Sequence, residues 1–75
     1  MDIEFGTSVV DKDGRPIGNV EKIFMDTWTG TPRKYMVRRE EEGPDTMYFF
    51  SPGQVGEAAP GSVKLNVSVE ELEKA

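Results

Sequence analysis

The chain contains no histidine and no cysteine. Without thiols it cannot form disulfide bonds, zinc–thiolate sites or a cysteine nucleophile, and without imidazole it has no histidine base or pH switch. Carboxylate pairs can also supply acid–base chemistry, and Asp13, Glu21 and Asp26 are the candidates for such a pair. Because no motif brings two of them into one pocket, we expect no enzymatic activity, no catalytic residues and no cofactor.

Long apolar runs are also absent. No stretch approaches the ~20 apolar residues of a membrane-spanning helix, and the acidic start Met1-Asp2-Ile3-Glu4 lacks the basic and apolar regions of a signal peptide. We therefore expect a cytoplasmic protein with no membrane span. The 75 residues are enough for one domain, in which a small core buries ~60% of the surface of the unfolded chain.

Basic residues are outnumbered, with 9 Lys and Arg against 14 Asp and Glu and a net charge of −5. Residues 1–40 hold seven of each sign, whereas residues 41–75 hold two basic and seven acidic side chains. A nucleic acid would meet net repulsion, because its affinity for proteins comes mostly from neutralised phosphates. We therefore expect a protein partner or self-association, and not nucleic acid, as the direct contact.

Apolar residues occur in short clusters separated by turn residues, a spacing that predicts an all-β chain folded as a small, partly open antiparallel barrel. Five clusters are expected to form strands: residues 8–11, 17–25, 33–40, 46–50 and 62–67. Asp13-Gly14 predicts a tight turn, and Gly18 predicts a bend or bulge near the start of the second strand. Residues 56–61 are rich in Gly, Ala and Pro and are expected to form an open loop.

The third and fourth strands are expected to pair across the polar connection 41–45, with Glu40 opposite Thr46. Alternation along the strands then gives two faces. The face assigned to the core holds Tyr35, Val37, Met47 and Phe49. The opposite face holds Lys34, Met36, Arg38, Tyr48 and Phe50, and it is either covered by the end of the chain or a contact surface.

The last residues, about 69–75, predict a short C-terminal helix. Ser68 is the expected N-cap, Glu71 its capping-box partner, and Val67 is expected to pack on Leu72 as a hydrophobic staple. Two helical turns do not persist alone in water, so Leu72 must dock on the rest of the chain.

Several short motifs follow one another along the chain. They are Gly6, residues 9–14 (VVDKDG) and 17–20 (IGNV), Ile23, Asp26, Thr29-Gly30, residues 35–37 (YMV) and 50–52 (FSP), Val55, and residues 63–65 (VKL). In this order they resemble a PRC-barrel domain, the family of the photosynthetic reaction-centre H subunit and of a domain in ribosome maturation factors. The resemblance covers residues 5–67 of one domain, 1–75, and the whole chain is similar to small stand-alone bacterial or archaeal members.

The resemblance implies a β-barrel of six strands, or a partly open one, that serves as a docking and assembly module. It brings no catalytic residues, and the family's turn motifs fall on Asp13-Gly14, Gly18, Asp26 and Gly30 with conformational roles. We therefore predict a non-enzymatic protein–protein interaction module, with a homodimer as one form of assembly. The alternative is an accessory RNA- or ribosome-associated factor, suggested by the ribosome-maturation branch and by the basic third strand.

Candidate binding residues follow from this prediction. Trp28 lies in a Thr-rich turn, where a large aromatic side chain suggests either an interface or a cap on the open end of the barrel. The candidate partner-binding residues are Trp28, Met36, Arg38, Tyr48 and Phe50. Asp11 and Asp13 could begin a calcium loop, but the sixth and twelfth positions of such a loop would be Pro16 and Lys22, so we expect an Asx-supported turn and no metal site.

Overall fold

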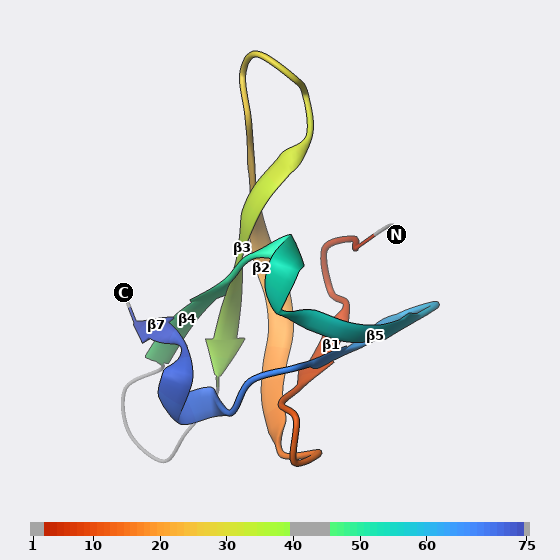
Figure 1. Cartoon of the computed structure of the whole chain (residues 1–75), viewed down its shortest axis with the longest axis vertical. Helices are drawn as coiled ribbons and strands as arrows, with labels where there is room; N and C mark the ends of the chain where they lie inside the picture. Colours follow the sequence, from red (N-terminus) through yellow and green to blue (C-terminus); the bar gives the residue numbers. More distant parts are fainter. Residues whose placement is uncertain (1–2, 40–45, 75) are drawn as a thin grey trace.

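The apolar clusters fold into strands that together make one curled, mixed sheet (Figure 1). The computed structural model describes residues 3–39 and 46–74. Its elements are β1 (Ser8–Val10), β2 (Pro16–Met25), β3 (Pro32–Arg39), β4 (Thr46–Phe50), the 3₁₀ turn η1 (Pro52–Gln54), β5 (Val55–Ala59), β6 (Ser62–Leu65), the 3₁₀ turn η2 (Val69–Glu71) and β7 (Glu73–Lys74). The all-β prediction is confirmed, and the sheet forms a half-barrel.

The sheet runs in the order β5-β6-β1-β2-β3-β4-β7. The expectation of a purely antiparallel sheet is wrong at one place, because β6 lies parallel to β1, with Val9 opposite Val63. The expected open loop at 56–61 is also wrong: β5 and β6 form a hairpin that turns at Pro60-Gly61, where Gly61 has a φ of 78°. This hairpin returns the chain beside β1 in the same direction.

The pairing of β3 with β4 differs by one residue from the expected register. Thr46 lies opposite Arg39 and not Glu40, so Tyr35 pairs with Phe50 and Val37 with Tyr48. A slip of one residue turns every side chain of a strand to the other face. The expected connection 41–45 lies outside the described residues.

The observed register places two aromatic side chains of β4 in the core, where the expected register places Met47 and Phe49. Tyr48 and Phe50 are 5% and 1% exposed, and Phe50 stacks on Tyr35 with ring centroids 5.0 Å apart. Burying two aromatic rings instead of one ring and a methionine removes more apolar surface from water. Tyr48 and Phe50 are therefore core residues, which corrects their placement on the outer face.

The core lies between the curled sheet and the chain ends. Its members are Ile3, Val9, Ile17, Val20, Tyr35, Val37, Tyr48, Phe50, Val63, Leu65, Val69 and Leu72. Val63 and Leu65 reach this core from β6, and Val67 is partly buried against the same cluster.

The expected C-terminal helix is wrong in its extent. Only the single turn η2 is helical, and the chain then extends into β7, which pairs with β4 through Tyr48 opposite Lys74 and Phe49 opposite Glu73. The predicted capping pair is present, since the Glu71 carboxylate accepts hydrogen bonds from the Ser68 N–H at 2.7 Å and the Ser68 hydroxyl at 3.1 Å. Leu72 is buried as expected. Pairing with the edge of β4 satisfies backbone groups that a helix of two turns would leave to water.

Gly18 lies in β2 where the backbone of β3 at Arg38 approaches closely. Its φ is 152°, and an added Cβ would overlap the carbonyl oxygen of Arg38. The register of β1 with β2 shifts beside it, between Val9 and Val10. The predicted irregularity at Gly18 is therefore confirmed, and its cause is a close backbone approach that only glycine permits.

We expect Gly18→Ala to lower the free energy of unfolding by roughly 2–4 kcal/mol, because the backbone of β2 or β3 must move to admit the methyl group. Urea titration followed by far-UV circular dichroism measures this loss. Gly53→Ala is the matched control, since a Cβ there meets nothing within 4 Å and its φ is not positive. Equal stability of the two variants would contradict this account.

Candidate functional site

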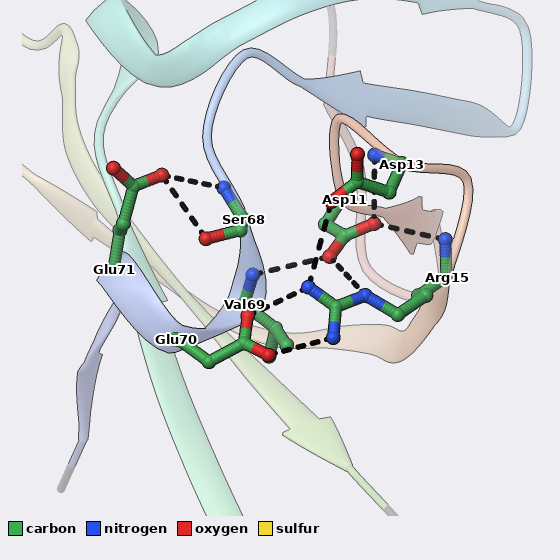
Figure 2. A network of polar contacts seen from close by, with 7 residues as sticks. All are labelled: Asp11, Asp13, Arg15, Ser68, Val69, Glu70 and Glu71. Atoms are coloured by element: carbon green, nitrogen blue, oxygen red, sulfur yellow. Dashed lines mark hydrogen bonds and ion pairs between the residues drawn. The ribbon is translucent and has the colours of Figure 1, made fainter.

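A buried carboxylate joins the two ends of the chain. Asp11 has no exposed surface. Its Oδ1 accepts hydrogen bonds from the N–H groups of Asp13 at 3.0 Å and Arg15 at 2.9 Å, and its Oδ2 accepts from Arg15 Nε at 2.9 Å and from the N–H of Val69 at 3.1 Å (Figure 2). The first of these bonds confirms the Asx-supported turn. Both oxygens are therefore used by the chain's own donors.

Arg15 extends this network to the surface. Its two terminal nitrogens donate to the two carboxylate oxygens of Glu70, each at 2.6 Å, while its Nε is held by Asp11 (Figure 2). A guanidinium that binds two carboxylates in this planar, forked manner fixes their relative positions. The β1–β2 turn is thus bonded to η2, 55 residues away in the sequence.

The same contacts set the protonation of the network. Burial raises the pKa of Asp11, but hydrogen bonds from Arg15, Val69 and Asp13 and the charge of Arg15 outweigh it, so the pKa lies below its usual value. The hydrogen bond from Arg15 lowers the pKa of Glu70 to about 2, and the same bond raises the pKa of Arg15. The network is therefore charged at neutral pH, with a structural role. Among the residues that the structure describes, no group of three or more acidic side chains is placed to hold a metal ion.

A second feature is the hairpin of β2 and β3, which rises away from the half-barrel (Figure 1). We call the distal part of this hairpin, residues 22–34, the arm; the rest of the hairpin belongs to the half-barrel, with Ile17, Val20 and Val37 in the core. Trp28 lies in the turn at its tip and is 94% exposed. The alternative that Trp28 caps the open end of the barrel is therefore wrong, because the indole covers almost nothing of its own chain.

The turn that carries Trp28 is tightly bonded. Asp26 Oδ1 accepts hydrogen bonds from the N–H groups of Trp28 at 2.8 Å and Thr29 at 3.1 Å, which lower the pKa of Asp26. The backbone closes it, since the N–H of Asp26 donates to Thr31 at 2.8 Å and that of Gly30 donates to Asp26 at 2.9 Å. The Thr29 and Thr31 hydroxyls are 2.6 Å apart. The turn thus holds Trp28 outward in one backbone conformation.

The outer face of the arm continues onto β4 as an aromatic and basic surface. Phe24 and Phe49 lie with ring centroids 6.0 Å apart, and Lys34 Nζ lies 5.3 Å and 4.4 Å from their respective centroids. Lys22 Nζ also lies 5.3 Å from Phe24. These lysines place cations on the faces of the rings, where the ring quadrupole attracts them.

A groove lies on this face at the base of the arm. Its volume is about 670 Å³. We call it the Phe24–Phe49 groove; its lining includes Phe24, Met25, Arg33, Lys34, Phe49 and Glu73. It is lined by aromatic side chains of β2 and β4, by basic side chains of β3 and by acidic side chains of η2 and β7.

The predicted partner-binding residues are divided between three places. Trp28 lies at the tip of the arm, and Met36 and Arg38 lie on the outer face, where Arg38 Nη1 is 3.4 Å from Glu21 Oε1. Tyr48 and Phe50 lie in the core. The structure therefore does not bring the five together as one surface.

Phe24 and Phe49 are surface residues that were not predicted from the sequence. The signal for Phe24 was its alternation with Lys22, which places both on one face of β2. Phe49 could be found only with the register of β4, because that register decides which of its neighbouring aromatic residues face outward.

Among the residues that the structure describes, none lies in a helix long and apolar enough to cross a membrane. Comparison of the chain with protein-family models and with curated proteins finds no match.

We expect Asp11→Ala to lower the free energy of unfolding by roughly 2–4 kcal/mol, because it leaves the buried N–H of Val69 and the part-buried N–H groups of Asp13 and Arg15 without an acceptor. Thermal and urea unfolding would measure it. Asp13→Ala is the matched control: its carboxylate is 58% exposed and 3.6 Å from Arg15, so its loss should cost within about 0.5 kcal/mol. A cost for Asp11→Ala no larger than that of the control would contradict the role of this network.

The free energy of unfolding should decrease in acid, because folding lowers the pKa values of several carboxyl groups. Those of Asp11, Asp26, Glu70 and Glu71 are lowered on folding, so their contribution is complete above about pH 4.5, the ordinary value for glutamate. It is lost as the pH falls toward 2, where the unfolded chain binds more protons. Urea titrations from pH 2 to 8 should show this fall, with little change from pH 5 to 8. A Glu70→Gln variant should show a smaller fall, and equal falls would contradict the assignment.

Proposed function

We propose that this protein is a non-enzymatic interaction module that contacts a partner protein through the tip of its arm. The observation that carries the proposal is Trp28, whose side chain is 94% exposed at the end of a projecting hairpin. Tryptophan is among the residues most enriched in the energetic centres of protein interfaces. Exposing so large an apolar ring costs solvation free energy unless a partner covers it.

The bonding of the turn supports the same function. A partner that binds a loop must order it, and this ordering subtracts from the affinity. Here Asp26 and Thr31 close the turn through hydrogen bonds, and Gly30 adopts a φ of 70° that favours glycine. Trp28 is therefore presented on a backbone that is ordered before binding.

A non-enzymatic role also agrees with the placement of the carboxylates. Asp13 and Asp26 lie beyond opposite ends of β2, whose length is roughly 30 Å at the usual rise per residue. They cannot act on one substrate atom together. Glu21 contacts Arg38 instead.

We further propose membership of the PRC-barrel family and a cytoplasmic location. The family proposal rests on the sequence resemblance, and the half-barrel is compatible with it. Three of the glycines in its turn motifs, Gly14, Gly18 and Gly30, have positive φ angles, as conformational roles require.

An RNA- or ribosome-associated role is the second candidate. Its support is the surface on which Lys22 and Lys34 lie against Phe24 and Phe49, since bases stack on such rings while cations meet phosphates. The net charge of −5 opposes it. This role would use the outer face, whereas the leading proposal uses the tip of the arm.

We expect Trp28→Ala to reduce capture of the partner from an extract of the source cell by at least tenfold, because it removes the central contact while leaving the fold intact. Quantitative mass spectrometry of material bound to the immobilised chain measures this. Phe5→Ala is the matched control, as Phe5 is 69% exposed and lies before β1, away from the tip. Capture unaffected by Trp28→Ala would overturn the proposal, and capture that is lost on nuclease treatment would support the RNA role in its place.

A further inference from the structure

The arm carries both an exposed aromatic side chain and a groove suited to receive one. Trp28 at the tip is uncovered, and the Phe24–Phe49 groove lies at the base of the same arm, beside Phe24 and Lys34. The groove volume of about 670 Å³ falls within the range of ligand pockets, roughly 300–1,000 Å³. It is thus large enough to admit an indole.

The chemistry of the groove matches a tryptophan side chain. Phe24 and Phe49 are tilted by 57° with centroids 6.0 Å apart, and both line the groove, where a third aromatic ring can pack on them beside the Lys34 ammonium group. Met25 is 51% exposed and also lines the groove. Thioether sulfur makes favourable contacts with aromatic rings.

The basic side of the groove matches the charge of the turn that carries Trp28, whereas Glu71 and Glu73 line its other side. Lys34 and Arg33 line the groove, and neither has a carboxylate within 4.0 Å among the described residues. The tip carries Asp26, two residues before Trp28, and hydrogen bonds keep it ionised. A tip that enters the groove would bring this carboxylate toward Lys34.

The two features are also placed for reciprocal contact. Phe24 and Trp28 are four residues apart on one hairpin, at most about 14 Å along an extended chain. When two copies lie with their arms antiparallel across a two-fold axis, each tip falls beside the base of the other arm. In such an isologous contact each copy supplies one tip and one groove, so the assembly closes as a dimer.

We propose that the chain forms a symmetric dimer in which Trp28 of each copy occupies the Phe24–Phe49 groove of the other. This inference rests on the proposed function and names its partner as a second copy. Two buried tryptophans and the groove surfaces that they cover give about 800 Å² in total, below the roughly 1,200–2,000 Å² of stable specific interfaces and within the range of weak, transient ones. The dimer is therefore weak and reversible, with a dissociation constant on the order of micromolar or higher.

The experiment combines sedimentation velocity with fluorescence over a series from low micromolar to millimolar concentration. Trp28 is the only tryptophan, so its emission reports directly on the groove contact. We expect the emission maximum to move to shorter wavelength in proportion to the dimer fraction. A monomer with unshifted emission at millimolar concentration would overturn the inference.

Variants test each half of the contact. Trp28→Ala should be monomeric throughout, and Phe5→Ala should dimerise like the parent chain. Lys34→Glu should raise the dissociation constant about tenfold at low salt, because it opposes Asp26 with a like charge. Lys64→Glu, on β6, is its matched control and should leave the constant unchanged. A dimer that survives Trp28→Ala, or that Lys34→Glu and Lys64→Glu affect equally, would also overturn the inference.

The failure of this inference can be told from failure of the proposed function. If the purified chain is monomeric but capture of a different protein still depends on Trp28, the arm binds a heterologous partner and only the dimer is wrong. If neither dimerisation nor capture depends on Trp28, both are wrong. Far-UV circular dichroism of each variant shows that it is folded before its assembly is compared.

Discussion

The buried carboxylate of Asp11 is the constraint on which the architecture depends. An ionised group without exposed surface is stable only when it is fully hydrogen-bonded, and Asp11 meets this condition with donors from two parts of the chain. Two of its contacts form the β1–β2 turn, and a third comes from the N–H of Val69 at the start of η2. The turn and the chain end must therefore assemble together.

The position of η2 then determines how the half-barrel is completed. Val69 and Leu72 join the core only when η2 lies against the β1–β2 turn, and β7 reaches the edge of β4 only after that turn of helix. A chain of 75 residues has little core, so these two side chains are a substantial part of it. The Arg15–Glu70 contact reinforces the same junction from the solvent side.

Much of this could be predicted from local sequence. The strand clusters, the Asp11 turn, the Ser68–Glu71 capping pair and the irregularity at Gly18 all depend on neighbouring residues, and the structure contains each of them. The β3–β4 register could not be derived in the same way, because it depends on the path of a connection and on which rings fill the core. The parallel pairing of β1 with β6 and the bond from Val69 to Asp11 join residues far apart, which no local pattern specifies.

The candidate site was harder to predict, because the single-residue difference in register exchanges the two faces of β4. With Thr46 opposite Glu40, Tyr48 and Phe50 would form an outer apolar surface with Met36; with Thr46 opposite Arg39, they fill the core and Phe49 replaces them outside.

The prediction that Trp28 lies in a turn did not depend on that register, because the bonding of this turn is local. Asp26 and its neighbours fix the backbone of this turn, and the projection of the arm beyond the half-barrel leaves the indole exposed. Charge is also distributed unevenly. The net value of −5 describes the whole chain, whereas Lys22, Arg33 and Lys34 all lie on the arm. Screening limits the influence of charges beyond about 10 Å. A partner of the arm therefore meets this basic and aromatic surface, with Asp26 at the tip and Glu73 in the groove, before it meets the acidic residues of the rest of the chain, and its complementarity must be judged there.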